Sequence, residues 1–267
     1  EPVGSYAITQ GTLALSSNYA LTYVGANFSI TPKPVTVTAT AGQTKMYGSD
    51  DPAAFVYSIT SGAPLAFSDS FSGSLTRAAG EPVASYAITQ GSLTLGSNYT
   101  LTFVSANFTI TPVPLAINPA NATRVYGSPN PAFTFTYSGL VNGDTAILTL
   151  PTCGTSTPLN TGVGAYVTIS CSGAASPNYS PITYGPNSTL TITAKPVTVT
   201  ADALQTKVYG AADPASFTYS ITSGAPLAFS DSFSGSLTRA AGEPVGSYAI
   251  TQGTLALSSN YALTYVG

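Results

Sequence analysis

Residues 1–11 read EPVGSYAITQG, and this stretch decides how the whole chain is organised. It returns at residues 81–91 with Ala84 in place of Gly4, and it returns unchanged at residues 243–253. Such self-similarity is typical of tandem arrays, in which each repeat is one small structural unit. The sequence therefore predicts a row of similar domains.

A Tyr-Gly pair supplies a second marker, at Tyr47, Tyr126 and Tyr209. Residues 1–25 also match residues 243–267 without exception, which favours a longer array of which this chain is a part. From these markers we expect units of about 80 residues. The expected segments are the C-terminal part of a repeat at 1–32, a complete repeat at 33–112, a divergent repeat at 113–194 and a repeat lacking its last strand at 195–267.

The residues within one unit follow a strand pattern. Val35, Val37 and Ala39 alternate with threonines, as in a half-buried strand. Turns rich in Gly and Pro recur about every 8–12 residues, which is typical of a small all-β fold. We expect either a β-sandwich of the Ig-like kind or a β-grasp-like roll, with room for one helical turn at Leu65–Ser70.

The connections between units are short. Thr111-Pro112-Val113-Pro114 and Thr193-Ala194-Lys195-Pro196 run from the last strand of one unit into the first strand of the next. Proline stiffens such connections, and no flexible Gly/Ser linker occurs. We therefore expect an elongated rod whose partners are neighbouring repeats of the same or of identical chains.

Composition excludes several kinds of partner. Charged residues make up only 6% of the 267 residues, against about 25% in an average soluble domain. Seven basic and ten acidic residues give a net charge of −3, and the basic residues do not cluster. A nucleic-acid partner is therefore not expected. No apolar run is long enough to span a bilayer, so we expect no membrane insertion, and no signal-peptide pattern is present.

Catalysis is not expected either. The chain contains no histidine, which removes the commonest general base and metal ligand. No Ser or Cys has a base to activate it, and no Gly-rich loop is placed to bind phosphate. The sequence thus predicts no enzyme, no catalytic residue, no cofactor and no metal site.

Four motifs of the third repeat point to a family. The stretches KVYGAADP (207–214), SGSLTR (234–239), GSYAI (246–250) and SNY (259–261) resemble the MBG/YDG-type repeats of large bacterial surface proteins and filamentous-haemagglutinin-like adhesins. The first repeat fits equally well, while the middle repeat departs from its neighbours at SGLVNGD (138–144). The resemblance implies an extracellular, adhesin-like repeat on a bacterial cell surface.

Cys153 and Cys171 occur only in the middle repeat. In an extracellular protein such a pair is usually a disulfide, and the alternative is two buried free thiols. A zinc site would need further ligands, which are missing.

Acidic residues occupy the turn that follows the Tyr-Gly pair in the first and third repeats. Asp50, Asp51 and Asp213 could suggest calcium, but each turn offers only one or two carboxylates, and Asn130 takes this place in the middle repeat. We interpret these residues as turn formers.

Two further groups of side chains have expected roles. Arg77 with Glu81, and Arg239 with Glu243, are expected to pair across a turn. The Tyr-Gly tyrosines could stack on sugars if exposed, but we expect each ring to pack over its own domain with its hydroxyl at the surface.

These observations favour a structural role. The leading hypothesis is a stalk or fibre repeat region of a bacterial adhesin or filament. The alternatives are a carbohydrate- or mucin-binding module, with host or matrix glycans as partners, and a filament subunit assembled by strand exchange.

Overall fold

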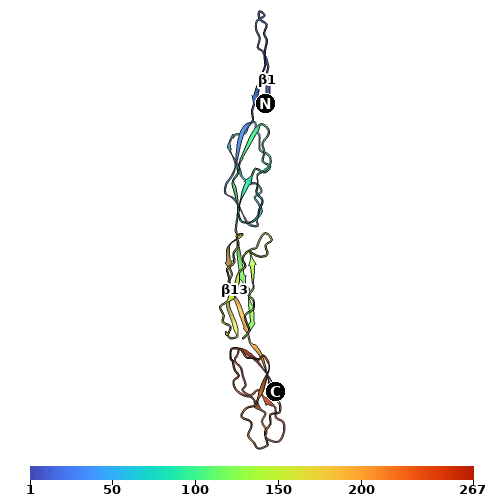
Figure 1. Cartoon of the computed structure of the whole chain (residues 1–267), viewed down its shortest axis with the longest axis vertical. Coiled ribbons are helices and arrows are strands. Elements are labelled where there is room, and N and C mark those ends of the chain that lie inside the picture. Colours follow the sequence, from blue (N-terminus) through green and yellow to red (C-terminus); the bar gives the residue numbers. More distant parts are fainter. The chain divides into compact units, whose positions relative to one another are not determined.

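The computed structural model describes all of residues 1–267 and contains strands only. No helix is present that could cross a membrane. The chain divides into two compact units. Figure 1 draws the strands as arrows, coloured along the sequence. Unit 1 comprises Glu1–Val113 with two short segments of the middle repeat, Val141–Thr145 and Ser176–Pro181. Unit 2 comprises Pro114–Leu140, Ala146–Ala175 and Ile182–Gly267.

The expected helical turn at Leu65–Ser70 is absent. Phe67 and Ser68 have φ angles of 51° and 65°, in the left-handed region. A right-handed turn needs negative φ at every residue, so this loop cannot continue as a helix.

The first complete repeat, in unit 1, consists of two sheets. The strand β3 (Lys33–Ala39) is the centre of one sheet, antiparallel to β5 and parallel to β8. The strand β9 (Asn107–Thr111) is central in the other, parallel to β4 and antiparallel to β7. The orders are β5 (Tyr57–Ser61), β3, β8 (Tyr99–Val104), and β4 (Gln43–Met46), β9, β7 (Ser85–Thr89), β6 (Thr76–Arg77).

Alternation along these strands builds the core. Val37, Ile88, Phe108 and Ile110 are completely buried, and they come from strands of both sheets. Their neighbours along each strand are mostly threonines on the opposite face, half-buried or exposed. Two sheets that each bury one face form a sandwich, which is the first of the two architectures that the sequence allowed.

The middle repeat has the same arrangement. One sheet has the order β12 (Phe135–Ser138), β10 (Val113–Pro119), β15 (Tyr179–Tyr184). The other has the order β11 (Ala122–Val125), β16 (Ser188–Thr193), β14 (Gly164–Ser172), β13 (Thr152–Thr155). The strand β16 is central, as β9 is in the first repeat.

The third repeat, in unit 2, is described as far as Gly267, which comes before the position of that central strand. Its first sheet is complete, with the order β18 (Tyr219–Ser223), β17 (Lys195–Ala201), β21 (Tyr261–Val266). Its second sheet consists of β19 (Thr238–Arg239) and β20 (Ile250–Thr251).

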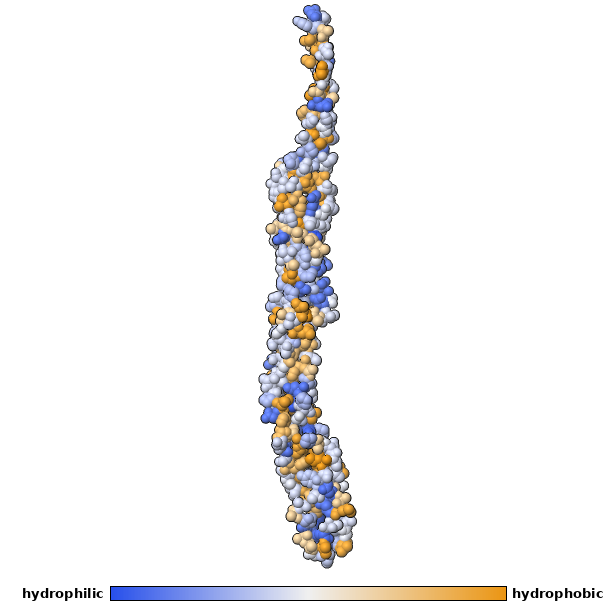
Figure 2. Space-filling model, in the orientation of Figure 1, coloured by the Kyte–Doolittle hydropathy of each residue, from blue (hydrophilic) through white to orange (hydrophobic).

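The first residues of the chain form a hairpin of β1 (Gly4–Ile8) and β2 (Ala26–Ile30). Tyr6 lies opposite Phe28, in the register in which Tyr86 lies opposite Phe108. Phe28 is 58% exposed, and hydrophobic residues show on the surface of this hairpin in Figure 2.

Threonine pairs lie across neighbouring strands in place of ion pairs. The hydroxyls of Thr38 and Thr60 share a hydrogen bond of 2.9 Å, and those of Thr76 and Thr89 share one of 2.8 Å. The third repeat has the same bonds at Thr200–Thr222 and Thr238–Thr251. Cross-strand pairs of this kind stabilise a sheet without charge.

The cysteines lie directly opposite each other on β13 and β14, with Cα atoms 4.0 Å apart, and their sulfur atoms are bonded. The bond closes a loop with a sequence separation of 18 residues. Closure of such a loop lowers the entropy of the unfolded chain.

We expect reduction of this bond to lower the free energy of unfolding of the middle repeat by about 3 kcal/mol. Denaturant unfolding with and without reductant measures this, with the other repeats as internal controls because they contain no cysteine. Free thiols in the untreated protein would contradict the pairing.

Candidate functional site: the joints between repeats

The Tyr-Gly pair of the first repeat lies at a joint inside unit 1. Tyr47 is only 4% exposed, and its hydroxyl donates to Asp144 Oδ2 at 2.9 Å. The amide of Asn142 donates to the same hydroxyl at 3.1 Å. The ring meets Tyr179 edge-on, with centroids 5.6 Å apart. All three partners belong to the following repeat, so Tyr47 joins two repeats.

The partner residues form a preorganised receiving site. The hydroxyl of Tyr179 donates to Asp144 Oδ2 at 2.8 Å and accepts from the backbone N–H of Val141 at 3.0 Å. Burial, together with the hydrogen bond to Asp144, raises the pKa of Tyr179 to about 12. Tyr179 therefore keeps its proton and remains a donor over the whole neutral range.

Unit 2 contains a second joint of the same design. Tyr126 is 4% exposed and donates to Asp231 Oδ2 at 3.0 Å. Its ring meets Tyr261 and Phe229 edge-on, each with centroids 5.5 Å away. Tyr261 donates to the same carboxyl oxygen at 2.8 Å, and burial with that bond raises its pKa to about 12.

The glycine after each tyrosine is required at the joint. Gly48 has φ of +77°, and an added Cβ would lie 2.5 Å from Val141 of the next repeat. Gly127 has φ of +80°, and its Cβ would lie 2.5 Å from Ala228. Any other residue would combine backbone strain with a clash.

A hydrogen bond from a backbone N–H to an asparagine side chain accompanies each joint. The side-chain oxygen of Asn178 accepts from the N–H of Val83 at 3.0 Å, and that of Asn260 accepts from Val163 at 2.9 Å. Asn98 accepts in the same way from Val3 of the N-terminal segment, at 2.9 Å. Each of these asparagines directly precedes a tyrosine, and this recurring Asn-Tyr pair was the available sequence signal for the receiving site.

The prediction that each Tyr-Gly ring packs over its own domain with a surface hydroxyl was wrong for Tyr47 and Tyr126. Both rings are buried against the following repeat, and both hydroxyls bind its carboxyl groups. Tyr209 contacts no following repeat in this structure and is 73% exposed.

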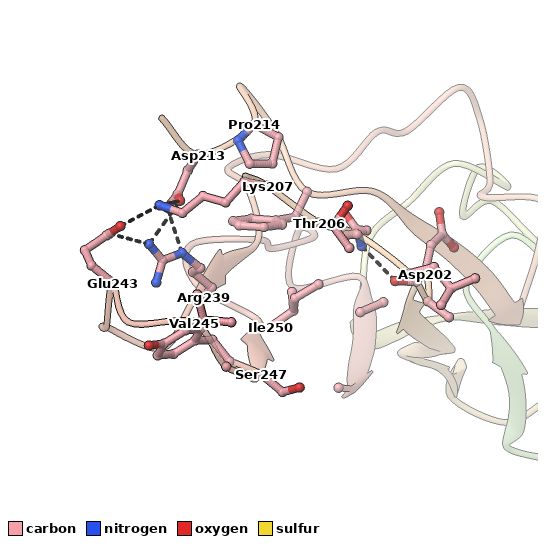
Figure 3. Close-up of a pocket in the computed structure, with 18 of the residues that line it drawn as sticks. Asp202, Thr206, Lys207, Asp213, Pro214, Arg239, Glu243, Val245, Ser247 and Ile250 are labelled. Atoms are coloured by element: carbon pink, nitrogen blue, oxygen red, sulfur yellow. Dashed lines mark hydrogen bonds and ion pairs between the residues drawn. The ribbon is translucent and has the colours of Figure 1, made fainter. Parts of the chain in front are cut away.

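A second cluster holds the turn after the Tyr-Gly pair in the first and third repeats. In the first repeat, Lys45 and Arg77 each bind both Asp51 and Glu81. The four distances lie between 2.6 and 2.8 Å, and the two basic side chains are 5% and 7% exposed. Figure 3 shows the equivalent cluster of the third repeat, made by Lys207, Asp213, Arg239 and Glu243.

The expected pairing of arginine with glutamate across the turn is confirmed, at Arg77–Glu81 and Arg239–Glu243. Lys45 and Asp51 also belong to this cluster, and their contacts were not predicted from the sequence. Both carboxyl oxygens of Asp51 bind basic groups, which gives this residue a structural role in the turn.

The middle repeat replaces this cluster with a single cation. Arg124 is 4% exposed and donates to the carbonyl oxygens of Pro158 and Leu159, at 3.1 and 3.0 Å. Asn130 stands where Asp51 stands in the first repeat. The middle repeat therefore holds its corresponding turn without carboxylates.

The geometry defines a class: tandem two-sheet β repeats, joined through a buried Tyr-Gly pair. The family model of the MBG domain (YGX type) matches residues 35–109, 115–191 and 197–267, and the chain belongs to this family. This confirms the resemblance drawn from the sequence. MBG repeats are non-catalytic modules typical of surface-exposed proteins. No curated protein matches the chain.

The joint predicts the effect of removing one hydroxyl. We expect Tyr47→Phe to weaken the docking of the first repeat on its neighbour by about 1–3 kcal/mol, because Asp144 and Asn142 lose a buried partner. Hydrogen exchange at Val141–Thr145 measures this opening. Tyr209→Phe is the matched control, since Tyr209 is exposed, and equal effects of the two substitutions would contradict the role of the joint.

The ionic cluster is expected to make the stability of the first repeat depend on pH. The hydrogen bond from Arg77, followed by that from Lys45, holds the pKa of Asp51 below its ordinary value, and Lys45 and Arg77 likewise lower the pKa of Glu81. Because these pKa values are depressed on folding, the cluster stabilises fully above the ordinary carboxyl pKa of about 4 and loses this contribution as pH falls below it.

We therefore expect the first repeat to lose stability between about pH 5 and pH 2, the range over which its carboxyl groups take up protons. The middle repeat, with Arg124 bound to carbonyl groups, serves as the control within the same molecule. Hydrogen exchange resolved by repeat measures both, and equal acid sensitivity would show that the cluster does not stabilise the turn.

Proposed function

We propose that this chain is part of a structural stalk or fibre in a bacterial extracellular or cell-surface adhesin or filament. The repeats supply length, and the joints supply stiffness. The observation that carries the proposal is the buried tyrosine at each joint, Tyr47 in unit 1 and Tyr126 in unit 2.

The joint chemistry supports stiffness on energetic grounds. An edge-on aromatic pair contributes about 0.5–1.5 kcal/mol beyond its buried area, and a hydrogen bond to a carboxylate about 1.5–3 kcal/mol. The joint at Tyr47 has one aromatic pair, and the joint at Tyr126 has two. Each joint also has one hydrogen bond from its tyrosine to a carboxylate and one asparagine contact. Bending at a joint would have to break these contacts together.

The short connections support the same proposal. Only Pro112 separates β9 from β10, and only Ala194 separates β16 from β17. A connection of one residue leaves little freedom of rotation, in contrast to a Gly/Ser linker.

Glycan binding is the competing function. Its best candidates were the Tyr-Gly tyrosines, but Tyr47 and Tyr126 are buried in joints and cannot stack on a sugar. A stalk function therefore accounts for more of the repeated residues than a glycan site does.

Solution scattering of the monomeric chain tests the proposal. We expect the profile of an elongated, stiff particle, and we expect the double variant Tyr47→Ala, Tyr126→Ala to scatter as a flexible chain of folded repeats. Tyr209→Ala is the control and should scatter as the parent chain does. A compact particle, or free flexing of the parent chain, would refute the stalk, and binding on a glycan array would favour the competing function.

A further inference from the structure

The strand β8 forms one edge of the first sheet in the first repeat, and only β3 pairs with it. The N–H of Lys33 in β3 donates to the carbonyl oxygen of Asn98 at 2.9 Å, and in a parallel pair every second residue bonds to the partner strand. The N–H and C=O groups of Leu101 and Phe103 therefore point away from β3, to a side on which no strand of the chain pairs with them.

The side chains of β8 leave this edge open to pairing. Its sequence, YTLTFV, contains no charge, no proline and no glycine. Thr100, Thr102 and Val104 are exposed on the outer face of the sheet. Leu101 and Phe103 point toward the core but are only half-buried. A neutral edge with such alternation is a template for a further strand.

The other edges of the same repeat are protected against pairing. The strand β4 carries Lys45, and β6 is only two residues long and contains Arg77. The pairing of β5 with β3 is interrupted by a bulge at Thr36 and Val37. Charge, short length and bulges each hinder the addition of another strand. The strand β8 has none of these protections.

The middle repeat closes the equivalent edge with a proline. In its edge strand β15, Pro181 is the third residue after Asn178, as Leu101 is the third after Asn98 in the first repeat. Proline has no N–H to donate, and Pro181 is exposed. The third repeat resembles the first, because its edge strand β21 (YALTYV) pairs with β17 as β8 pairs with β3 and contains no proline. Open edges therefore occur in the first and third repeats, with a closed edge in the repeat between them.

We propose that β8 pairs with β8 of a second copy of the chain, antiparallel and edge to edge, and that β21 pairs with β21 in the same way. In the first repeat, Leu101 of each copy then lies opposite Phe103 of the other, and their free N–H and C=O groups form the bonds between the copies. Thr102 lies opposite its own counterpart on the two-fold axis. This association goes beyond the stalk function and does not depend on it.

The chemistry of the edge favours a second copy as the occupant. Thr102 would meet Thr102, as Thr38 already meets Thr60 across neighbouring strands at 2.9 Å. The half-buried Leu101 and Phe103 would cover each other across the interface, which extends the core of both copies. No like charges meet, because β8 carries none.

A cysteine on the two-fold axis tests the register. The two Thr102 residues would form a pair without backbone hydrogen bonds, whose Cα atoms lie about 4.5 Å apart. A disulfide spans about 4.4–6.8 Å between Cα atoms. We therefore expect the complete chain with Thr102→Cys to give two covalently joined chains on a non-reducing gel after mild oxidation, and reductant should separate them.

Thr100→Cys is the matched control, because Thr100 is exposed on the same face of the same strand. In the proposed register each Thr100 lies opposite Val104 of the other copy, so the two Thr100 residues are about 13 Å apart and too distant for a disulfide. Both variants keep the bond between Cys153 and Cys171, so exchange with it would affect them equally. Joined chains from neither variant, or equally from both, overturn the proposal.

Light scattering tests the association without a covalent bond. We expect the mass of the parent chain to rise with concentration beyond that of one copy. The double variant Thr102→Lys, Thr264→Lys should stay single at the same concentrations, because like charges would meet on each two-fold axis. The control Ser170→Lys, Ser172→Lys adds the same charge at exposed residues of β14 and should associate as the parent does.

Two results of the scattering experiment overturn the proposal. One is a parent chain that stays single at all concentrations, which would leave a strand of a different protein as the candidate for this edge. The other is association that persists unchanged in the Thr102→Lys, Thr264→Lys chain. The stiffness of the chain is measured on single copies, so neither result decides the stalk function.

Discussion

In the first and middle repeats, the central strand of the second sheet holds the repeat together, because it pairs along both edges and supplies fully buried core side chains. In the first repeat, β9 joins β4 to β7 and buries Phe108 and Ile110 completely. The strand β4 has no other strand partner, so its place in the sheet depends on β9.

The same strand also couples one repeat to the next. It continues into the first strand of the following repeat after a single residue, so the end of one core and the start of the next are linked covalently. Beside this connection, Tyr47 and Tyr126 enter the receiving sites of their neighbours. Core completion and joint formation are therefore two results of placing one segment, and neither needs a residue with chemical reactivity.

The sequence predicted the all-β fold well because the residues within one strand are enough to indicate which of its side chains are buried. The alternation at Val35, Val37 and Ala39 holds in the structure. It predicted Arg77–Glu81 for a similar reason, since the two residues lie four positions apart. It failed at Tyr47, whose partner Asp144 lies in a loop of another repeat, 97 residues away. A tyrosine with a buried apolar ring and a satisfied hydroxyl looks the same in sequence whichever domain surrounds it. Contacts across a joint depend on how two surfaces meet, and no local pattern records that.

The threonine pairs on the sheet faces affect how the stability of this protein depends on salt concentration. Bonds such as Thr38–Thr60 and Thr200–Thr222 join neutral hydroxyls, so dissolved ions have no charge there to shield. A surface stabilised by exposed ion pairs would weaken as salinity rises. We therefore expect the cross-strand bonding outside the turn clusters to depend little on salt concentration.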